Sequence, residues 1–199
     1  PSFAAPPLPE QKPELPRVVI MSTGGTIASR VDYRTGAVRP ALSASDLYGV
    51  VPELSDIARV DTQILFSLYS ENITPKHWAR IAKTAADHIS LGVSGVVVAH
   101  GTDTMAYTAA ALSFALQNLP VPVILVGAQR SSDRPSSDAA TNLIGAVQAA
   151  AKAPFAEVVI AMHETVSDTT IVINRGTKVR KCHTSRRDTF KPVNATPLA

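Results

Sequence analysis

The chain has 199 residues, 45% of them hydrophobic and 18% charged, which is typical of one soluble globular domain and unlike a disordered or fibrous chain. Its apolar runs, such as residues 121–128, are far shorter than the roughly 20 residues of a membrane-spanning helix, so we expect no membrane span. The formal net charge is only +3, and the basic residues are spread along the chain except for one cluster near the C-terminus, which could contact a nucleic acid or a carboxylate or form a solvated face. That basic cluster comprises Arg175, Lys178, Arg180, Lys181, Arg186 and Arg187.

The first sixteen residues predict an extended linker, because they hold six of the fifteen prolines and show almost no periodicity. After them, short β-branched runs alternate with alanine-rich helical stretches, which predicts an α/β fold with a mostly parallel sheet. These runs are too continuously apolar for a sheet with one wet face, so we expect helices on both faces. The predicted strands cover residues 17–21, 60–66, 95–99, 121–126, 157–162 and 170–173.

Three helices with readable ends lie between these strands. The first is predicted to begin with Thr74 as N-cap and Pro75 at the first helical position, and to stop near Gly92. The second follows Thr104 to about residue 118, and the third spans about residues 137–153.

Three polar segments follow predicted strands: residues 22–26, 100–104 and 129–138. In open α/β sheets, ligands bind in the crevice beyond the carboxyl ends of the strands, so we expect these segments to converge. The sequence concentrates hydroxyl groups there.

Two other kinds of site fit the sequence poorly. Glycines that lead into a helix can bind phosphate, but neither the G-x-G-x-x-G spacing nor a G-K-[ST] ending is present around Gly24 and Gly25. The five histidines show no paired ligand spacing and there is one cysteine, Cys182, so no metal site is predicted. A lone cysteine also excludes an internal disulfide and favours a reducing, cytoplasmic setting.

Hydroxyl chemistry needs an activating group, since a free threonine is a weak nucleophile. Thr102 and Asp103 place a hydroxyl beside a carboxylate, and Lys181 lies on a later polar stretch where it could act as a base. Spacing alone leaves the alternative open that Thr102 is a turn residue and Lys181 one of several surface cations.

Four motifs favour the catalytic interpretation of these residues. Residues 23–28 (TGGTIA) and 100–105 (HGTDTM) resemble the two signature loops of the bacterial-type L-asparaginases, in the same order. Ser70, eight residues before Trp78, resembles the family's substrate-binding serine. Lys181, seven residues before the triplet 188–190 (DTF), resembles its catalytic lysine.

The resemblance implies roles for particular residues. Thr26 would be the primary nucleophile, and Thr102, Asp103 and Lys181 would form a second catalytic cluster. Tyr33 is the candidate for the family's activating tyrosine, although it lies closer to the first threonine than in other members. Ser70 and Asp103 would hold the α-carboxylate and α-amino groups of glutamine or asparagine, with Glu71 adjacent.

Within the family, residues 31–38, 129–138 and 183–188 resemble the asparaginase-like subunit of the archaeal glutamyl-tRNA(Gln) amidotransferases. That resemblance implies a glutaminase that passes ammonia to a tRNA-binding partner subunit, which contacts the tRNA and consumes ATP with Mg²⁺; no cofactor is expected in this chain. The alternatives are a stand-alone L-asparaginase and an inactive binding domain that retains the fold.

The family also suggests how the chain is organised. Residues 1–16 would be a linker, residues 17–191 the N-terminal, Rossmann- or flavodoxin-like domain of an asparaginase, and residues 192–199 the start of a linker to a smaller C-terminal domain that is absent from this sequence. Members of the family are homodimers whose sites are completed by the other subunit's smaller domain, so this chain alone is expected to be poorly active.

Overall fold

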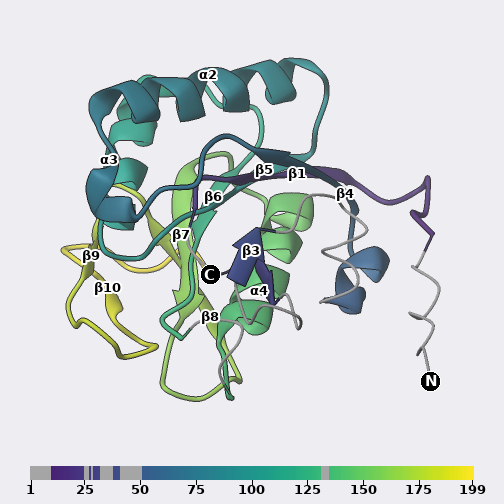
Figure 1. Ribbon diagram of the computed structural model, residues 1–199. Coiled ribbons are helices and arrows are strands. Elements are labelled where there is room, and N and C mark those ends of the chain that lie inside the picture. Colours follow the sequence, from purple (N-terminus) through teal and green to yellow (C-terminus); the bar gives the residue numbers. More distant parts are fainter. Residues whose placement is uncertain (1–9, 25–26, 28, 32–37, 41–50, 131–134) are drawn as a thin grey trace, which may run out of the picture.

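A six-stranded sheet forms the centre of the protein, in the order β4-β1-β5-β6-β7-β8 (Figure 1). The first five strands of that order run parallel and β8 pairs antiparallel with β7, which confirms the predicted α/β fold with a mostly parallel sheet. The strands are β1 (Arg17–Ser22), β4 (Arg59–Ile64), β5 (Gly95–Ala99), β6 (Val123–Val126), β7 (Val158–His163) and β8 (Ile171–Arg175). The structure is a computed structural model that describes residues 10–24, 27, 29–31, 38–40, 51–130 and 135–199.

Helices cover both faces of the sheet, as predicted. Helices α2 (Pro75–Ser90) and α3 (Met105–Ala115) lie on one face, and α4 (Ala139–Lys152) lies on the other (Figure 1). Thr74 is the N-cap of α2 and Pro75 is its first residue, as predicted. Helix α3 ends three residues earlier than predicted, and α4 begins after Asp138.

Alternate residues of β1 show how the two cores divide. Val18 and Ile20 pack in one core with Leu143 of α4. Val19 and Met21 pack in the other core with Leu112 of α3 and Ile81 of α2. All these side chains are at most 2% exposed. Burial of a large aliphatic side chain stabilises the folded state by about 1.5–3 kcal/mol, so both faces of β1 contribute to the core.

Several short elements were not predicted. Two antiparallel pairs stand apart from the main sheet, β2 (Ser29–Val31) with β3 (Val38–Pro40) and β9 (Val179–Lys181) with β10 (Phe190–Pro192). Two 3₁₀ helices, η1 (Pro52–Asp56) and η2 (Ser70–Asn72), complete the described elements. Each is only three to five residues long, too short for a periodic sequence pattern.

Both ends of the described chain contact the main sheet. In the predicted N-terminal linker, the carbonyl of Pro16 accepts a hydrogen bond from the backbone of Arg59 in β4 (2.9 Å). In the predicted start of the interdomain linker, Leu198 donates to the carbonyl of Ile173 in β8, and Ala199 accepts from Ile173 (both 2.8 Å). The domain boundaries themselves stay a prediction.

In the part of the chain that the structure describes, no helix is long and apolar enough to cross a membrane.

The order of the parallel strands locates a crevice. Strand β4 lies on one side of β1 and β5 on the other, which is the flavodoxin-like order with its switch point between β1 and β5. Ligands in such folds bind beyond the carboxyl ends of the strands at this point. Thr23 and His100 are the residues that follow β1 and β5, and the Thr23 hydroxyl and amide both donate to the carbonyl of Ala99 (2.9 and 3.0 Å).

A buried chain of hydrogen bonds holds the backbone at this edge. The indole of Trp78 donates to the Thr108 hydroxyl (2.9 Å), which contacts Nε2 of His100 (2.8 Å), and His100 Nδ1 lies 2.6 Å from the carbonyl oxygen of Gly101. Since that carbonyl only accepts, Nδ1 carries the hydrogen and Nε2 accepts from Thr108. Burial lowers the pKa of His100 to about 4, although its bond to the Gly101 carbonyl opposes that shift.

His100 predicts a pH dependence of stability. Between pH 6.5 and about 4 the unfolded chain binds a proton at His100 and the folded protein does not, so the unfolding free energy should decrease as the pH falls. The full effect is on the order of 3 kcal/mol. Urea unfolding at several pH values should show that the unfolding free energy of His100→Gln depends less on pH than that of the wild type. An equal pH dependence in the two proteins would contradict the lowered pKa of His100.

Candidate active site

The loop between β5 and α3 carries the predicted hydroxyl and carboxylate and also fixes Ser70. Thr104, the N-cap of α3, donates its hydroxyl to the carbonyl of Ser70 (2.7 Å). A Cβ atom on Gly101 would lie 2.9 Å from the Ser70 hydroxyl oxygen, so a larger residue at 101 would displace the serine. Ser70 is 4% exposed, and its neighbour Glu71 is exposed. The predicted substrate-binding serine therefore lies directly against the Thr102 loop.

Lys181 reaches the same loop from the end of β9. Its ammonium donates to the Thr102 hydroxyl oxygen (2.8 Å) and to Oδ1 of Asp103 (2.7 Å). The lysine side chain is only 11% exposed, whereas that of Asp103 is 69% exposed. The structure thus brings together three predicted residues, although 79 positions separate Lys181 from Thr102. Charge-assisted bonds of this length are stronger than neutral ones and fix the ammonium between the two oxygens.

Gln129 is a member of this cluster that the sequence did not single out. Its side-chain oxygen accepts the Thr102 hydroxyl hydrogen (2.7 Å), and its Nε2 donates to the carbonyls of Arg186 (2.9 Å) and Thr184 (3.3 Å). The available signal was its position at the start of the third polar segment, since the segment as a whole was expected at this edge.

Close packing between β5 and β6 allows the Thr102–Gln129 contact. A Cβ atom on Gly127 would lie 2.8 Å from the Thr102 methyl carbon and 2.8 Å from the carbonyl oxygen of His100. Only a residue without a side chain permits this approach. Gly127 therefore sets how near the two loops come.

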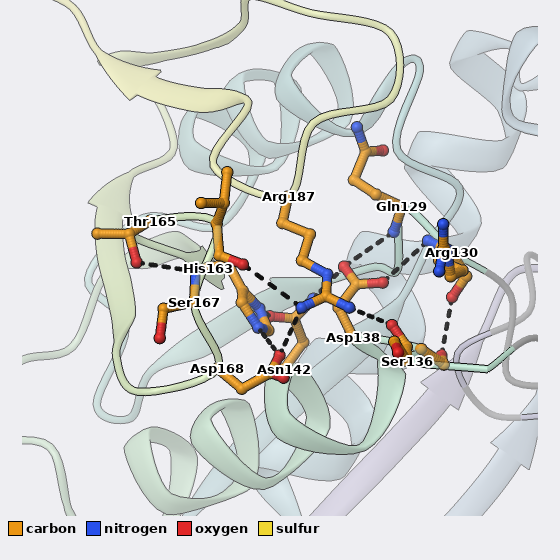
Figure 2. A network of polar contacts seen from close by, with 12 residues as sticks. Gln129, Arg130, Ser136, Asp138, Asn142, His163, Thr165, Ser167, Asp168 and Arg187 are labelled. Carbon is orange, nitrogen blue, oxygen red and sulfur yellow. Dashed lines mark hydrogen bonds and ion pairs between the residues drawn. The ribbon is translucent and has the colours of Figure 1, made fainter.

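A buried network fixes the backbone of Gln129, and Figure 2 shows its members. Asp138, which is 0% exposed, accepts bonds from the backbone amides of Gln129 (3.0 Å) and Arg130 (2.9 Å). The side-chain amide of Asn142 donates to Asp138 (3.0 Å), and its oxygen lies 2.6 Å from Nδ1 of His163. The polar groups of this network are paired, as buried groups must be to avoid a desolvation cost.

The segment after Lys181 is held at its far end. The backbone amide of Cys182 donates to the carbonyl of Thr189 (2.8 Å) next to the β9–β10 pair, and Arg186 and Lys191 donate to the carboxylate of Asp188 (2.9 and 3.1 Å). These bonds, led by that from Arg186, lower the pKa of Asp188 to about 2. The carboxylate is therefore charged throughout the physiological range.

Arg187 joins this segment to two others (Figure 2). Its guanidinium donates to Asp168 in the β7–β8 connection (2.9 Å) and to the carbonyl of Ser136 before α4. The hydrogen bond from His163, followed by the charge of Arg187, holds the pKa of Asp168 below its usual value. With Arg175 on Glu157 (3.3 Å) and Lys181 on Asp103, four of the six residues of the basic cluster thus face carboxylates of the same chain.

A cavity of about 290 Å³ opens beside the cluster, and its walls include Asp103, Tyr107, Lys181 and Cys182. Arg180 lies over the ring of Tyr107, 5.1 Å from its centre. A larger cavity of about 430 Å³ lies between Leu116, Glu157 and Thr177 and contains none of the predicted site residues. We regard the smaller cavity as the relevant one because it adjoins the groups that can do chemistry.

Two predicted residues, Thr26 and Tyr33, lie outside the described residues, so their roles stay predictions. Among the residues that are described, no group of three histidine, cysteine or acidic side chains is arranged to hold a metal ion.

Comparison with known proteins agrees with this geometry. A sequence model of the family described as "Asparaginase, N-terminal" matches residues 17–199. The chain is 58% identical over 190 residues to a protein from Pyrococcus abyssi that is named as a subunit of glutamyl-tRNA(Gln) amidotransferase, covering 96% of this chain and 43% of that protein. It is 56% identical over 186 residues to the protein of the same name from Thermofilum pendens, covering 92% and 41%. The chain thus spans less than half the length of these relatives.

Two solved structures share the fold. The thermostable L-asparaginase from Thermococcus kodakarensis matches with a TM-score of 0.76 and 33% identity, over 92% of this chain and 52% of that one. A probable cytoplasmic L-asparaginase from Campylobacter jejuni matches with a TM-score of 0.78 and 31% identity, over 92% and 55%. The matched family covers nearly the whole chain, and Thr23 meets the end of β5, where the loop 100–105 begins, at one edge of the sheet. The chain belongs to the asparaginase family, of which it carries the N-terminal domain.

Proposed function

We propose that this chain is the asparaginase-like part of a glutamine-hydrolysing subunit of a tRNA-dependent amidotransferase. One observation carries the hydrolytic half of the proposal: the Lys181 ammonium lies within hydrogen-bonding distance of both the Thr102 hydroxyl and the Asp103 carboxylate. A threonine flanked by a lysine and a carboxylate is an arrangement that can activate a hydroxyl toward an amide carbonyl.

In the proposed reaction, a threonine hydroxyl oxygen adds to the side-chain amide carbonyl of glutamine. The bond between the carbonyl carbon and the nitrogen breaks, and the hydroxyl proton passes to the leaving nitrogen. Ammonia departs, and the acyl group remains on the enzyme as a threonine ester. Water then cleaves this ester, which yields glutamate and restores the hydroxyl. Thr26 is the proposed first nucleophile, with Tyr33 as its activator, and Thr102 with Lys181 is the proposed second hydroxyl and base.

Substrate binding in this proposal falls to the neighbouring polar groups. Ser70 would hold the α-carboxylate and Asp103, which remains largely exposed, would hold the α-amino group, with Glu71 beside them. The position of Ser70 against Gly101 supports this division, because it lies directly under the loop that carries Asp103.

The 58% identity to proteins named as amidotransferase subunits, against 31–33% to asparaginases, favours glutamine hydrolysis within a complex. We propose a tRNA-binding partner subunit that receives the ammonia, contacts the tRNA and uses ATP with Mg²⁺, and a cytoplasmic homodimer of the present chain.

Ammonia release tests this proposal. The full-length protein should be assayed with glutamine and with asparagine, alone and with its partner subunit and a glutamyl-tRNA. We expect faster ammonia release from glutamine than from asparagine, and a further increase in the rate of release from glutamine when the partner and tRNA are added. Preference for asparagine by the free protein would favour a stand-alone L-asparaginase, and no release from either amino acid would favour an inactive binding domain.

Removing either threonine hydroxyl should abolish this activity while the fold remains intact. Thr102→Val keeps the shape of the side chain but leaves Lys181 without one of its two oxygen partners, so we expect kcat to fall by at least about a hundredfold. Thr26→Ala should have an effect of similar size. The exposed Thr177→Val serves as the matched control. Near-normal turnover in either active-site variant would make that threonine a structural residue.

Substitutions of Lys181 test whether this residue acts as a base or only supplies a positive charge. A guanidinium keeps the positive charge but does not release a proton near neutral pH. If Lys181 is the base, Lys181→Arg should lose kcat almost as completely as Lys181→Met, by about a hundredfold or more. Exposed Lys178→Arg is the control. An active Lys181→Arg enzyme would show that charge alone suffices.

A further inference from the structure

Gln129 makes three side-chain hydrogen bonds that link the two halves of the candidate site. Its Oε1 accepts from the Thr102 hydroxyl, and its Nε2 donates to the carbonyls of Thr184 and Arg186, which follow Lys181 in the chain. One amide group therefore touches both the hydroxyl and the segment that carries the lysine.

The orientation of this amide is set by chemistry. Reversing it would place the oxygen against two backbone carbonyls and the NH₂ group against the hydroxyl, which would cost two hydrogen bonds. The Thr102 hydroxyl hydrogen must then point at Gln129, since a carbonyl oxygen only accepts, and a lone pair of the same oxygen faces the Lys181 ammonium at 2.8 Å. While Lys181 is an ammonium, Gln129 thus fixes the position of the Thr102 oxygen, and a neutral Lys181 could accept the same hydroxyl hydrogen without a movement of that oxygen.

Gln129 is itself firmly anchored. Its backbone amide donates to Asp138, which is buried and bonded in turn to Asn142. In Figure 2 the Gln129 side chain extends away from this anchor. The backbone is held on one side and the amide reaches the site on the other, an arrangement that transmits the rigidity of the interior to a reactive group.

We propose that Gln129 is a positioning residue that fixes the Thr102 oxygen and holds the 182–188 segment, so that Lys181 stays within hydrogen-bonding distance of that oxygen. This inference rests on the proposed amide hydrolysis. Gln129 acts through Thr102 and Lys181, so its removal should affect the rate of the chemical steps more than substrate affinity.

The principal test is Gln129→Met in the full-length protein with its partner subunit. Methionine has a similar size and makes none of the three bonds. We expect kcat for glutamine hydrolysis to fall by about tenfold to a hundredfold, while KM changes by less than about threefold. Gln148→Met, which changes an exposed glutamine of α4, is the matched control and should leave both parameters unchanged. Wild-type kcat in Gln129→Met would overturn the proposal.

A second variant tests whether residue 129 lies close enough to the reacting groups to act on them. Gln129→Glu can still accept the Thr102 hydroxyl hydrogen, but it cannot donate to the two carbonyls and it adds a negative charge near the Lys181 ammonium. That charge favours the protonated site, so the ascending limb of the pH–rate profile should move to higher pH. An unchanged profile would show that residue 129 does not lie close enough to the reacting groups to act on them, and that result would contradict the inference.

Trypsin provides a readout that needs no catalysis. Loss of the bonds to Thr184 and Arg186 should speed cleavage after Arg186, which is exposed, by about tenfold in Gln129→Met but not in Gln148→Met. Unchanged cleavage would overturn the anchoring role. Comparison with the wild type and Thr102→Val separates the hypotheses. If Thr102→Val is inactive while Gln129→Met is normal, only the role of Gln129 fails, and if the wild type releases no ammonia from glutamine, the proposed function fails.

Discussion

The parallel pairing of β1 with both β4 and β5 is the constraint on which the candidate site depends. Because β1 and β5 are parallel neighbours, the chain must leave both at the same edge of the sheet. The crevice at this edge is therefore a consequence of topology. Thr23 joins the end of β1 to the end of β5 by donating twice to the carbonyl of Ala99, and the loop from His100 to Thr104 begins at the same edge.

Around this crevice, buried polar groups are paired in chains that begin in the core and end at the loops. One chain runs from Trp78 through Thr108 to His100, and another from His163 through Asn142 to Asp138. A buried polar atom without a partner costs about 1–3 kcal/mol, so each chain favours a single arrangement of the loop that it supports. The loops that carry Thr102 and Gln129 owe their definition to this pairing rather than to secondary structure of their own.

The site also joins distant parts of the sequence through charge. The segment that brings Lys181 to Thr102 is stabilised by Arg186 and Lys191 on Asp188, and by Arg187 on Asp168. Exposed ion pairs of this kind contribute little individually, but the side chain of Asp188 is only 11% exposed and shared by two cations. Part of the basic cluster near the C-terminus thus serves to shape the loop around the candidate base.

The sequence by itself determined the strands of the main sheet, the three α-helices and the three polar segments, because these depend on local apolar periodicity and on capping residues such as Thr74 and Pro75. The resemblance to asparaginases added Thr102, Asp103 and Lys181 as a cluster. Only the tertiary structure decided that Lys181 lies between the two oxygens, that Gln129 joins them, and that β8 pairs antiparallel with β7. The physical reason is that these contacts join residues tens of positions apart, through single hydrogen bonds or three-residue strands such as β9, which leave no periodic pattern in the sequence.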